Sequence, residues 1–220
     1  MNASPSYVEV AIVRTGTANV ASVAACLRRC GCHATIESDP ARIARATRVV
    51  LPGVGSFGAA MQTLTEAGLA DVLRERVRAG SPTLCICLGL QLLFESSEES
   101  PGVRGLSVAE GTVTRFSSSV RTPQLGWNRV SPSSSQTCDS ATFGGVQDSG
   151  FAYYANSYCA RLAPPGWSIA STEYDGPFVA AMWRGAVLAC QFHPELSGRW
   201  GQQLVQHWLA SSVAPEGVAC

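Results

Sequence analysis

The chain contains no lysine, so all 16 of its cationic side chains are arginines. Chemistry that depends on a lysine amine is therefore excluded. The formal net charge is +0. The chain has no surplus of basic residues that would indicate nucleic-acid binding, and no polybasic tail that would indicate membrane binding. No apolar run approaches the length that is needed to span a bilayer.

Features of secreted proteins are also missing. The first ten residues, MNASPSYVEV, lack the basic start and the long apolar stretch of a signal peptide. Nine cysteines are an odd number, and their irregular spacing is a poor match to a disulfide framework. We therefore expect a cytoplasmic protein whose thiols stay reduced. With 15% charged and 46% hydrophobic residues the chain can bury a full core, and its length predicts a single domain over residues 1–220.

Strand-like and helix-like patterns alternate in the first half of the chain. Apolar runs predict strands at residues 8–13, 48–51 and 83–87. Helical spacing predicts helices at residues 19–30 and 59–79, and the second helix is expected to break near Gly68. Such alternation predicts an α/β fold with an open, mostly parallel central sheet and helices on both faces.

The second half of the chain changes character. Short β-like runs separated by Gly, Pro and Ser predict a mixed or antiparallel extension of the sheet, at residues 111–116, 151–160, 167–174, 178–183 and 186–192. A last helix is expected over residues 198–211. The Ser-rich and Gly-rich stretch 131–150 indicates a surface loop.

The segment LCICLGLQ, residues 84–91, is the most informative part of the chain. Its apolar run stops at Cys87, the small Gly89 follows two places later, and residues 90–94 suit a helix. This order predicts a strand, a sharp turn and a helix, a geometry that resembles the nucleophile elbow of hydrolases with Cys in place of Ser. A thiol at a helix N-terminus favours the reactive thiolate. Taken alone, however, Cys87 would more often be a small buried hydrophobe.

Two further segments end predicted strands and supply partners for this thiol. They are PGVG, residues 52–55, and QFHPE, residues 191–195. Open α/β sheets place their sites at the carboxyl ends of their strands. His193 can take the Cys87 proton and deliver it to a leaving amine, while Glu195 can orient the imidazole. Each motif alone has a simpler reading, as a turn, a strand cap or a solvated charge, but their joint occurrence favours a catalytic triad.

Attack of a thiolate on a carbonyl creates an oxyanion that needs backbone N–H donors. The amide of Leu88, directly after the thiol, is one candidate. The flexible turn Gly53, Val54 and Gly55 supplies another, from the amide of Val54 or Gly55.

The remaining cysteines are less informative. Cys26, Cys30, Cys32 and His33 lie close in sequence, but they lack the paired spacing of zinc sites, so no metal site is predicted. Cys85 stands two residues before Cys87, and we expect its side chain to point to the same side of the strand. Core packing is the favoured interpretation of Cys85, with a redox neighbour of Cys87 as the alternative.

Together these motifs resemble those of the class I (triad-type) glutamine amidotransferases. CLGLQ at residues 87–91 is similar to the nucleophile motif of that family, FHPE at 192–195 to its His-Pro-Glu motif, and PGVG at 52–55 to its oxyanion strand. Within the class, the chain most resembles the glutaminase subunits of imidazole glycerol phosphate synthases. Supporting matches run in order through nearly the whole chain: Gly16, Asn19, EGTVTRF at 110–116, LGWN at 125–128 and NSY at 156–158.

The resemblance implies a reaction. L-glutamine would be hydrolysed through a thioester on Cys87 to glutamate and ammonia, with Gln91 near the glutamine pocket. Ammonia would pass through a channel into a cyclase subunit, a (β/α)₈ barrel with which the chain would form a heterodimer. There it would join a ribulosyl-formimino nucleotide to give imidazole glycerol phosphate and an aminoimidazole carboxamide ribotide, in histidine biosynthesis. No metal or organic cofactor is implied.

Four positions depart from the pattern of the family. Arg14 replaces an acidic residue, Cys85 a Gly, Asn156 a His, and Leu196 a partner-facing Lys. The loss of that cation removes an interfacial ion pair, and such pairs govern specificity and association rate. The departures leave two alternatives: a paralogue that feeds ammonia to a different sugar- or nucleotide-modifying synthase, and a non-catalytic regulatory subunit. A peptidase is a weaker alternative, because Gln91 has no obvious place in one.

Overall fold

The computed structural model describes residues 7–15, 19–132 and 149–211. The strands within these ranges are β1 (Val8–Val13), β2 (Cys32–Glu37), β3 (Val49–Gly53), β4 (Thr83–Cys87), β5 (Ser96–Ser97), β6 (Thr112–Arg115), β7 (Gln124–Pro132), β8 (Gly150–Asn156), β9 (Tyr158–Ala160), β10 (Ser168–Glu173), β11 (Pro177–Arg184) and β12 (Val187–Cys190). The helices are α1 (Val20–Arg29), α2 (Pro40–Arg45), α3 (Phe57–Glu66), α4 (Leu69–Arg78), α5 (Leu88–Gln91), the 3-10 turn η1 (Pro194–Leu196) and α6 (Gly198–Ala210).

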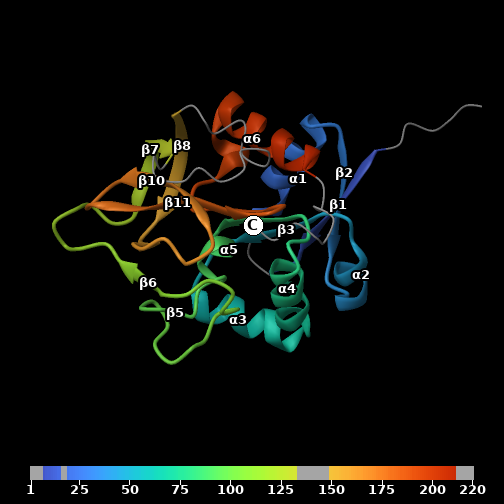
Figure 1. Ribbon diagram of the computed structural model, residues 1–220, viewed down its shortest axis with the longest axis horizontal. Coiled ribbons are helices and arrows are strands. Elements are labelled where there is room, and N and C mark those ends of the chain that lie inside the picture. The colour runs from blue at the N-terminus through green and yellow to red at the C-terminus, as the bar shows by residue number, and fades with distance from the viewer. Residues whose placement is uncertain (1–6, 16–18, 133–148, 212–220) are drawn as a thin grey trace, which may run out of the picture.

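Nine of the strands form one central sheet, in the order β2-β1-β3-β4-β12-β11-β10-β7-β8. The strands from β2 to β12 pair in parallel, and those from β12 to β8 pair antiparallel. Figure 1 shows α1 and α6 over one face of the sheet and α3 and α4 under the other. The predicted α/β fold, with its antiparallel extension, is confirmed.

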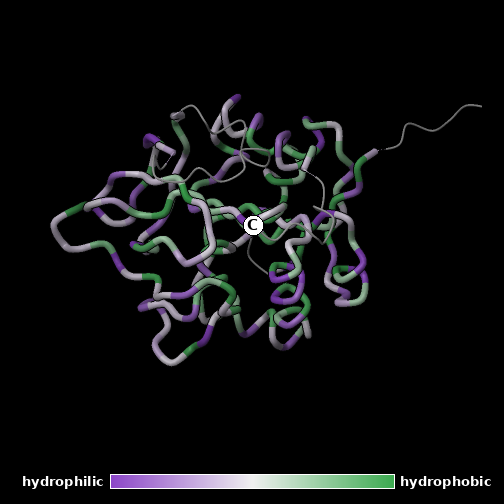
Figure 2. The backbone as a smooth tube through the Cα atoms, viewed as in Figure 1, coloured by the Kyte–Doolittle hydropathy of each residue, from purple (hydrophilic) through white to green (hydrophobic). Residues whose placement is uncertain are grey.

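The middle of the sheet is apolar on both faces. All residues of β3, β4 and β12 are buried, as expected for parallel strands that are covered by helices on both sides. Figure 2 shows hydrophobic segments in the centre of the molecule, where these strands lie. One core cluster joins this sheet to α1 and α6 through Leu27 and Trp208, and the other joins it to α3 and α4 through Phe57 and Leu73.

Local signals fix where the helices begin and end. The side chains of Asn19, Asp39 and Ser56 accept hydrogen bonds from backbone amides in the first turns of α1, α2 and α3, which satisfies N–H groups that have no partner inside the helix. Gly68 has φ +68° between α3 and α4, a conformation that glycine adopts without strain. The predicted break near Gly68 is therefore confirmed.

Some elements have no clear signal in the sequence. Edge strand β2 has a single buried residue, and along most of β7 exposed residues alternate with buried or partly buried ones, so neither strand forms an apolar run. The expectation of a loop over 131–150 is wrong at both ends, because Ser131 and Pro132 pair with β10 and Gly150 begins β8. Residues 133–148 of that stretch, and Gly16 of the family motif, lie outside the described residues.

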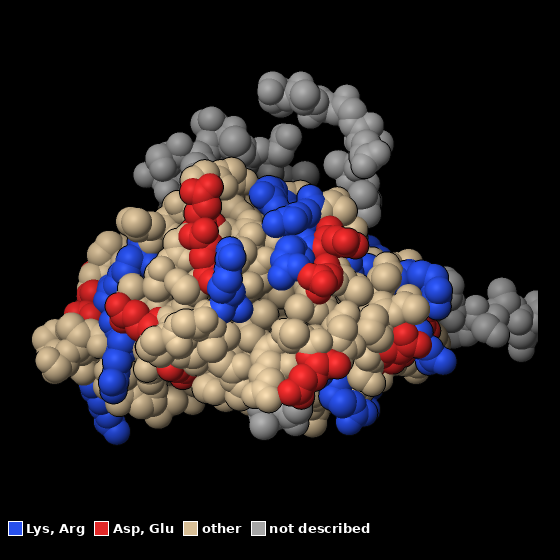
Figure 3. All heavy atoms as spheres, turned by 90° about the horizontal axis from the view of Figure 1, so that it is seen from below, with Lys and Arg blue, Asp and Glu red and all other residues tan. Residues whose placement is uncertain are grey.

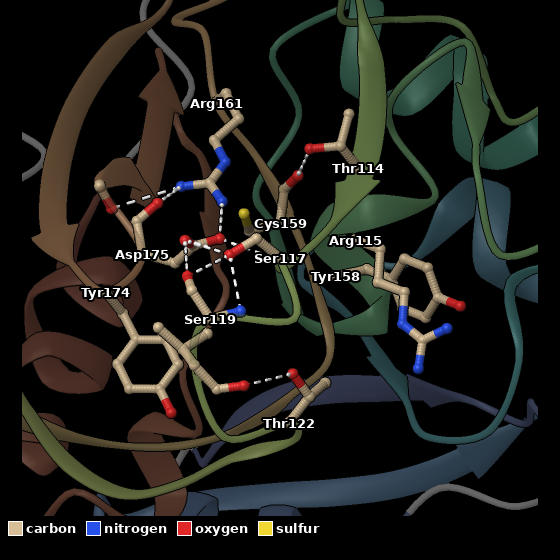
Figure 4. A network of polar contacts seen from close by, with 12 residues as sticks. Thr114, Arg115, Ser117, Ser119, Thr122, Tyr158, Cys159, Arg161, Tyr174 and Asp175 are labelled. Atoms are coloured by element: carbon tan, nitrogen blue, oxygen red, sulfur yellow. Dashed lines mark hydrogen bonds and ion pairs between the residues drawn. The ribbon is translucent and has the colours of Figure 1, made fainter.

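An ionic network ties the antiparallel extension together (Figure 4). Arg161 donates to the carboxylate of Asp175 at 2.8 Å, and Asp175 also accepts from the Ser117 amide and hydroxyl, both at 2.7 Å. The Ser117 amide is the main cause of the lowered pKa of Asp175. The network joins the segment after β6 to the turn between β10 and β11.

The outer surface below the sheet carries both charge signs. Figure 3 shows Arg and Asp or Glu side chains interspersed over this face, in keeping with the formal net charge of +0. No helix of the described ranges has the length and hydrophobicity to cross a bilayer.

A buried arginine holds α2 against α4. Arg76 is 7% exposed, and its guanidinium donates to the carbonyls of Ile43, Ala44 and Ala46 at the end of α2 and of Pro82 before β4, at 2.9–3.2 Å. Burial lowers the pKa of Arg76. The cation thus adds a donor for carbonyls at the end of α2, including those of Ala44 and Ala46.

We expect Arg76→Met to lower the free energy of unfolding by about 3 kcal/mol, because the variant removes the donor to the Ala44 and Ala46 carbonyls and leaves the carbonyls of Ile43 and Pro82 with one donor each, a backbone amide. Urea unfolding followed by tryptophan fluorescence measures the change. Arg78→Met, on the exposed face of the same helix, is the matched control and should change stability by no more than about 0.5 kcal/mol. Equal effects of the two variants would contradict this role of Arg76.

Candidate active site

Three neighbouring strands end together and bring the predicted motifs to one edge of the sheet. Gly53 at the end of β3 pairs with Cys87 at the end of β4, and Cys190 at the end of β12 pairs with Ile86 on the other side of β4. His193 follows three residues after Cys190. Segments that are far apart in the chain therefore meet at the carboxyl edge of the parallel sheet, where open α/β folds build their sites.

The turn at Cys87 is sharp. Cys87 has φ +53° and ψ −109° and caps the N-terminus of α5, so a non-glycine residue occupies a sparsely populated region. Helix α5 begins at Leu88 and ends at Gln91. The prediction of a helix over residues 90–94 is thus wrong in its bounds: the helix begins two residues earlier and ends three residues earlier, because the elbow itself starts the helix.

Glycine is required on both sides of this elbow. A Cβ atom on Gly89 would lie 2.2 Å from the Leu51 carbonyl oxygen, and one on Gly53 would lie 2.7 Å from the Leu88 Cβ atom. The two glycines let α5 approach β3 closely, so that Leu88 follows the thiol directly beside the predicted oxyanion turn.

The expectation that Cys85 and Cys87 point to the same side is wrong. Cys85 lies in the core cluster under α3 and α4, whereas Cys87 lies in the cluster on the opposite face. The positive φ of Cys87 breaks the alternation of the strand. Burial raises the pKa of Cys85 to about 12, so it is a protonated core thiol on the far side of the sheet.

His193 and Glu195 form a buried pair. The Nδ1 atom of His193 lies 2.9 Å from Oε1 of Glu195, and their exposed fractions are only 7% and 8%. The backbone of His193 is held by two hydrogen bonds: its amide donates to the Tyr153 carbonyl at 2.9 Å, and its carbonyl accepts from the Ser197 hydroxyl at 2.6 Å. The ring therefore has a fixed orientation.

The electrostatics of the site favour an imidazolium at His193. Burial acts to lower its pKa, but hydrogen bonds and charge interactions with Cys87 and Glu195 outweigh burial and raise the pKa to about 10. Cys87 therefore lies close enough to the His193 side chain to affect its protonation. A thiol, a base and a carboxylate in this order can carry out nucleophilic attack on a carbonyl group, with the proton held on His193.

The predicted oxyanion segment lies next to this triad. Pro52, Gly53 and Val54 line a small pocket together with His193 and Glu195. Gly55 adopts φ +98°, and the Thr15 hydroxyl donates to the Pro52 carbonyl at 3.2 Å. Leu88 is the first residue of α5, a position whose amide has no partner within the helix.

Gln91 is joined to the thiol by a residue that the sequence did not single out. The Nε2 atom of Gln191 lies 3.7 Å from the Cys87 sulfur, and its Oε1 atom accepts from Gln91 Nε2 at 3.0 Å. Gln191 stands in the QFHPE segment, but nothing in the residue pattern distinguishes it from a strand residue. Only the pairing of β4 with β12 brings it to Cys87.

The other positions noted in the sequence lie in different surroundings. Within the described residues no group of three or more potential ligands could hold a metal ion, and His33 pairs with Glu9 at 2.9 Å on the surface. Asn156 is buried and donates to the Tyr158 carbonyl at 3.0 Å. Arg14 is exposed, and Leu196 is 40% exposed.

Comparisons with known proteins agree with this geometry. Residues 11–210 match the family model described as "Glutamine amidotransferase class-I". A protein of Symbiobacterium thermophilum is 39% identical over 199 residues, which cover 90% of this chain and 92% of that one. A protein of Thermococcus kodakarensis is 42% identical over 204 residues, covering 90% and 98%. Both carry the name "Imidazole glycerol phosphate synthase subunit HisH".

Solved structures share the fold at lower identity. A crystal structure of a glutamine amidotransferase superposes with a TM-score of 0.71 at 20% identity and covers 91% of this chain and 98% of that one. The structure of PurLQS from Thermotoga maritima gives a TM-score of 0.69 at 15% identity, with 93% of this chain and 99% of the matched one covered. At these identities the likeness concerns the fold alone.

Proposed function

Because the chain belongs to the class-I glutamine amidotransferase family, we propose that it is the glutaminase subunit of an imidazole glycerol phosphate synthase. The observation that carries this proposal is the similarity to the two relatives of that name along almost their whole length. In this function the chain hydrolyses L-glutamine and passes ammonia to a cyclase subunit, in the cytoplasm, for histidine biosynthesis. The match over residues 11–210 supports one amidotransferase domain over residues 1–220.

The triad gives this reaction its steps. The Cys87 sulfur attacks the side-chain carbonyl of glutamine, and the carbon–nitrogen bond breaks to leave a thioester and ammonia. His193 holds the thiol proton and transfers it to the departing nitrogen. It then removes a proton from the water that attacks the thioester, and it returns that proton to the Cys87 sulfur as the carbon–sulfur bond breaks and glutamate leaves. Glu195 keeps the His193 ring in the required tautomer. The 2.9 Å contact between His193 and Glu195 supports these roles.

Backbone amides next to the thiol stabilise the oxyanion in this scheme. The Leu88 amide and one amide of the Gly53, Val54 and Gly55 turn are the proposed donors, and Gln91 is the proposed contact to the substrate. Gly53 approaches Leu88 closely. This supports the proposed oxyanion donors, because the Leu88 amide and an amide of the glycine turn can then converge on the carbonyl that Cys87 attacks.

An apolar surface beside the triad suits the cyclase partner, a (β/α)₈ barrel in this proposal. Leu125, Trp127 and Phe151 are 57–62% exposed and share the outer face of β7 and β8. Tyr153 joins this face to the site, since its ring packs edge-on against that of Trp127, with 6.2 Å between the ring centroids, and its carbonyl accepts from the His193 amide. Contiguous exposed apolar side chains mark protein-binding surfaces. Leu196 follows Glu195 of the triad and stands where the family has a partner-facing Lys. In this proposal it contributes an apolar contact to the cyclase in place of an ion pair.

We expect the cyclase together with its nucleotide ligand to stimulate ammonia release from glutamine by about tenfold or more, because occupancy of one subunit is coupled to catalysis in the other. Ammonia release by the chain alone and with increasing cyclase measures this effect. No stimulation at saturating cyclase would overturn the assignment. Stimulation by a different synthase would favour the paralogue.

Two variants separate docking from catalysis in this experiment. Trp127→Ala should raise the cyclase concentration for half-maximal stimulation by about tenfold, since buried aromatic residues dominate interface energies. Ile36→Ala is the matched control, because Ile36 is 49% exposed but lies on β2, at the other edge of the sheet. A shift with Ile36→Ala and none with Trp127→Ala would place the interface elsewhere.

A further inference from the structure

A chain of buried amides runs from the thiol toward the proposed substrate contact. Gln191 is fully buried, with its Nε2 atom 3.7 Å from the Cys87 sulfur. Its Oε1 atom accepts from Nε2 of Gln91 at 3.0 Å, and that same Nε2 atom donates to the Tyr158 carbonyl at 3.0 Å. In this way the end of β4, the end of α5, the residue after β12 and the start of β9 are connected behind the elbow.

The direction of this amide chain is fixed by its last member. The Tyr158 carbonyl can only accept, so Gln91 must turn its NH₂ group toward it. Gln191 must then present its oxygen to the second hydrogen of that NH₂ group, and its own NH₂ group is left facing the sulfur. The assignment of both amides therefore follows from the hydrogen-bond network.

Two chemical consequences follow. First, the Cys87 sulfur receives an N–H donor from Gln191 in addition to the His193 ring, and a donor stabilises a thiolate more than a thiol. Second, both hydrogens of the Gln91 amide are spent within the protein. The Gln91 side chain can then offer only its oxygen, which selects a hydrogen-bond donor such as the ammonium or the carboxamide NH₂ group of glutamine.

We propose that Gln191 is a positioning residue that donates a hydrogen bond to the Cys87 sulfur and holds Gln91 with its oxygen toward the substrate. The part of this proposal that concerns the substrate rests on the proposed glutaminase function, whereas the part that concerns the sulfur does not. His193, with Glu195 behind it, is the titratable partner of Cys87 in this site, and Cys85 lies on the opposite face of the sheet. Gln191 itself does not titrate.

Two substitutions separate the two contacts. Gln191→Glu keeps an oxygen for the Gln91 amide but removes the NH₂ group that faces the sulfur. Gln191→Met has a side chain of similar length and removes both the donor to the Cys87 sulfur and the acceptor for the Gln91 amide. Gln124→Met is the matched control, because Gln124 is another buried glutamine of the sheet but belongs to β7. Circular dichroism confirms folding of each variant.

The first measurement is the rate of Cys87 alkylation by iodoacetamide against pH, with peptide mass spectrometry to distinguish Cys87 from the other cysteines. Both Gln191 variants should move the midpoint of this profile upward by about one pH unit. At a pH below the midpoint, this shift corresponds to about a tenfold smaller fraction of thiolate and a tenfold slower alkylation. Gln124→Met should leave it unchanged. Midpoints of both Gln191 variants equal to that of the wild type would overturn the sulfur contact.

The second measurement is the KM for glutamine with saturating cyclase. Gln191→Met should raise KM by about tenfold relative to Gln191→Glu, because only the Glu variant still holds the Gln91 amide. Equal KM values would overturn the orientation of Gln91. If the wild type releases no ammonia, the proposed function fails, but the alkylation profile still decides the sulfur contact.

Discussion

Replacing Cys87 by alanine should abolish glutamine-dependent ammonia release, with a loss of about 10⁴-fold or more, because the thioester cannot form without the sulfur. The effect on stability should be small, since the deleted atom is a single sulfur at the edge of the core. Ammonia release with saturating cyclase measures the loss, and thermal unfolding shows that the variant is folded.

The matched control is Cys85→Ala, two residues earlier in the same strand. Cys85 is completely buried in the opposite core cluster, so its removal should cost about 1 kcal/mol of stability and leave the turnover rate within about twofold, because no reacting group contacts it. A large loss of turnover in Cys85→Ala together with full activity in Cys87→Ala would reverse the assignment.

Covalent labelling gives an independent test of the same thiol. A chloroketone analogue of glutamine should modify wild type and Cys85→Ala at Cys87, and it should not modify Cys87→Ala. Labelling reports attack by the sulfur without requiring ammonia transfer to a partner. A wild type that is never labelled would instead favour the non-catalytic regulatory subunit, because such a subunit would not need a reactive thiol.

The parts of the site that the sequence predicts are those that come from uninterrupted apolar strands. β3, β4 and β12 are buried on both faces, so each appears as a short apolar run that stops at a chemically distinctive residue. Parallel strands then bring Gly53, Cys87 and the segment after Cys190 to one edge. The neighbourhood of the triad is therefore predictable from the sequence.

The parts that the sequence does not predict depend on backbone conformation at single residues and on strand pairing. The φ of +53° at Cys87 turns its side chain away from the face of Cys85, and no periodic pattern encodes that reversal. The contact of Gln191 with Cys87 joins residues that are 104 positions apart. β7 has no apolar run that would predict a strand, because one of its faces is exposed and includes Trp127, so its residues alternate in polarity.

Glu195→Gln should reduce turnover by about 10³-fold to 10⁴-fold while preserving the shape of the site. In the wild type the Glu195 carboxylate accepts from Nδ1 of His193, which leaves Nε2 free to take the Cys87 proton. A glutamine amide can donate to Nδ1 instead, and the ring would then present a hydrogen, rather than a lone pair, to the thiol. Glu195→Asp, which keeps the charge, should retain more turnover than Glu195→Gln.

The same variant has a predictable effect on the pH dependence of stability. The pKa of His193 rises from its ordinary value of 6.5 to about 10 in the folded chain, and Glu195 contributes to that rise. A raised pKa means that protonated His193 stabilises the fold fully below about pH 6.5, and that this stabilisation is lost as the pH rises through about 10. Without the Glu195 charge, the loss should occur at lower pH.

Urea unfolding of wild type and Glu195→Gln between pH 6 and pH 10 measures this difference. The free-energy difference between the two proteins should be largest at the acidic end and should shrink toward pH 10, because His193 then becomes neutral in both folded states. A difference that stays constant across this range would mean that Glu195 acts only through packing. A difference that shrinks, together with the loss of turnover, would show that one carboxylate both orients His193 and holds its proton.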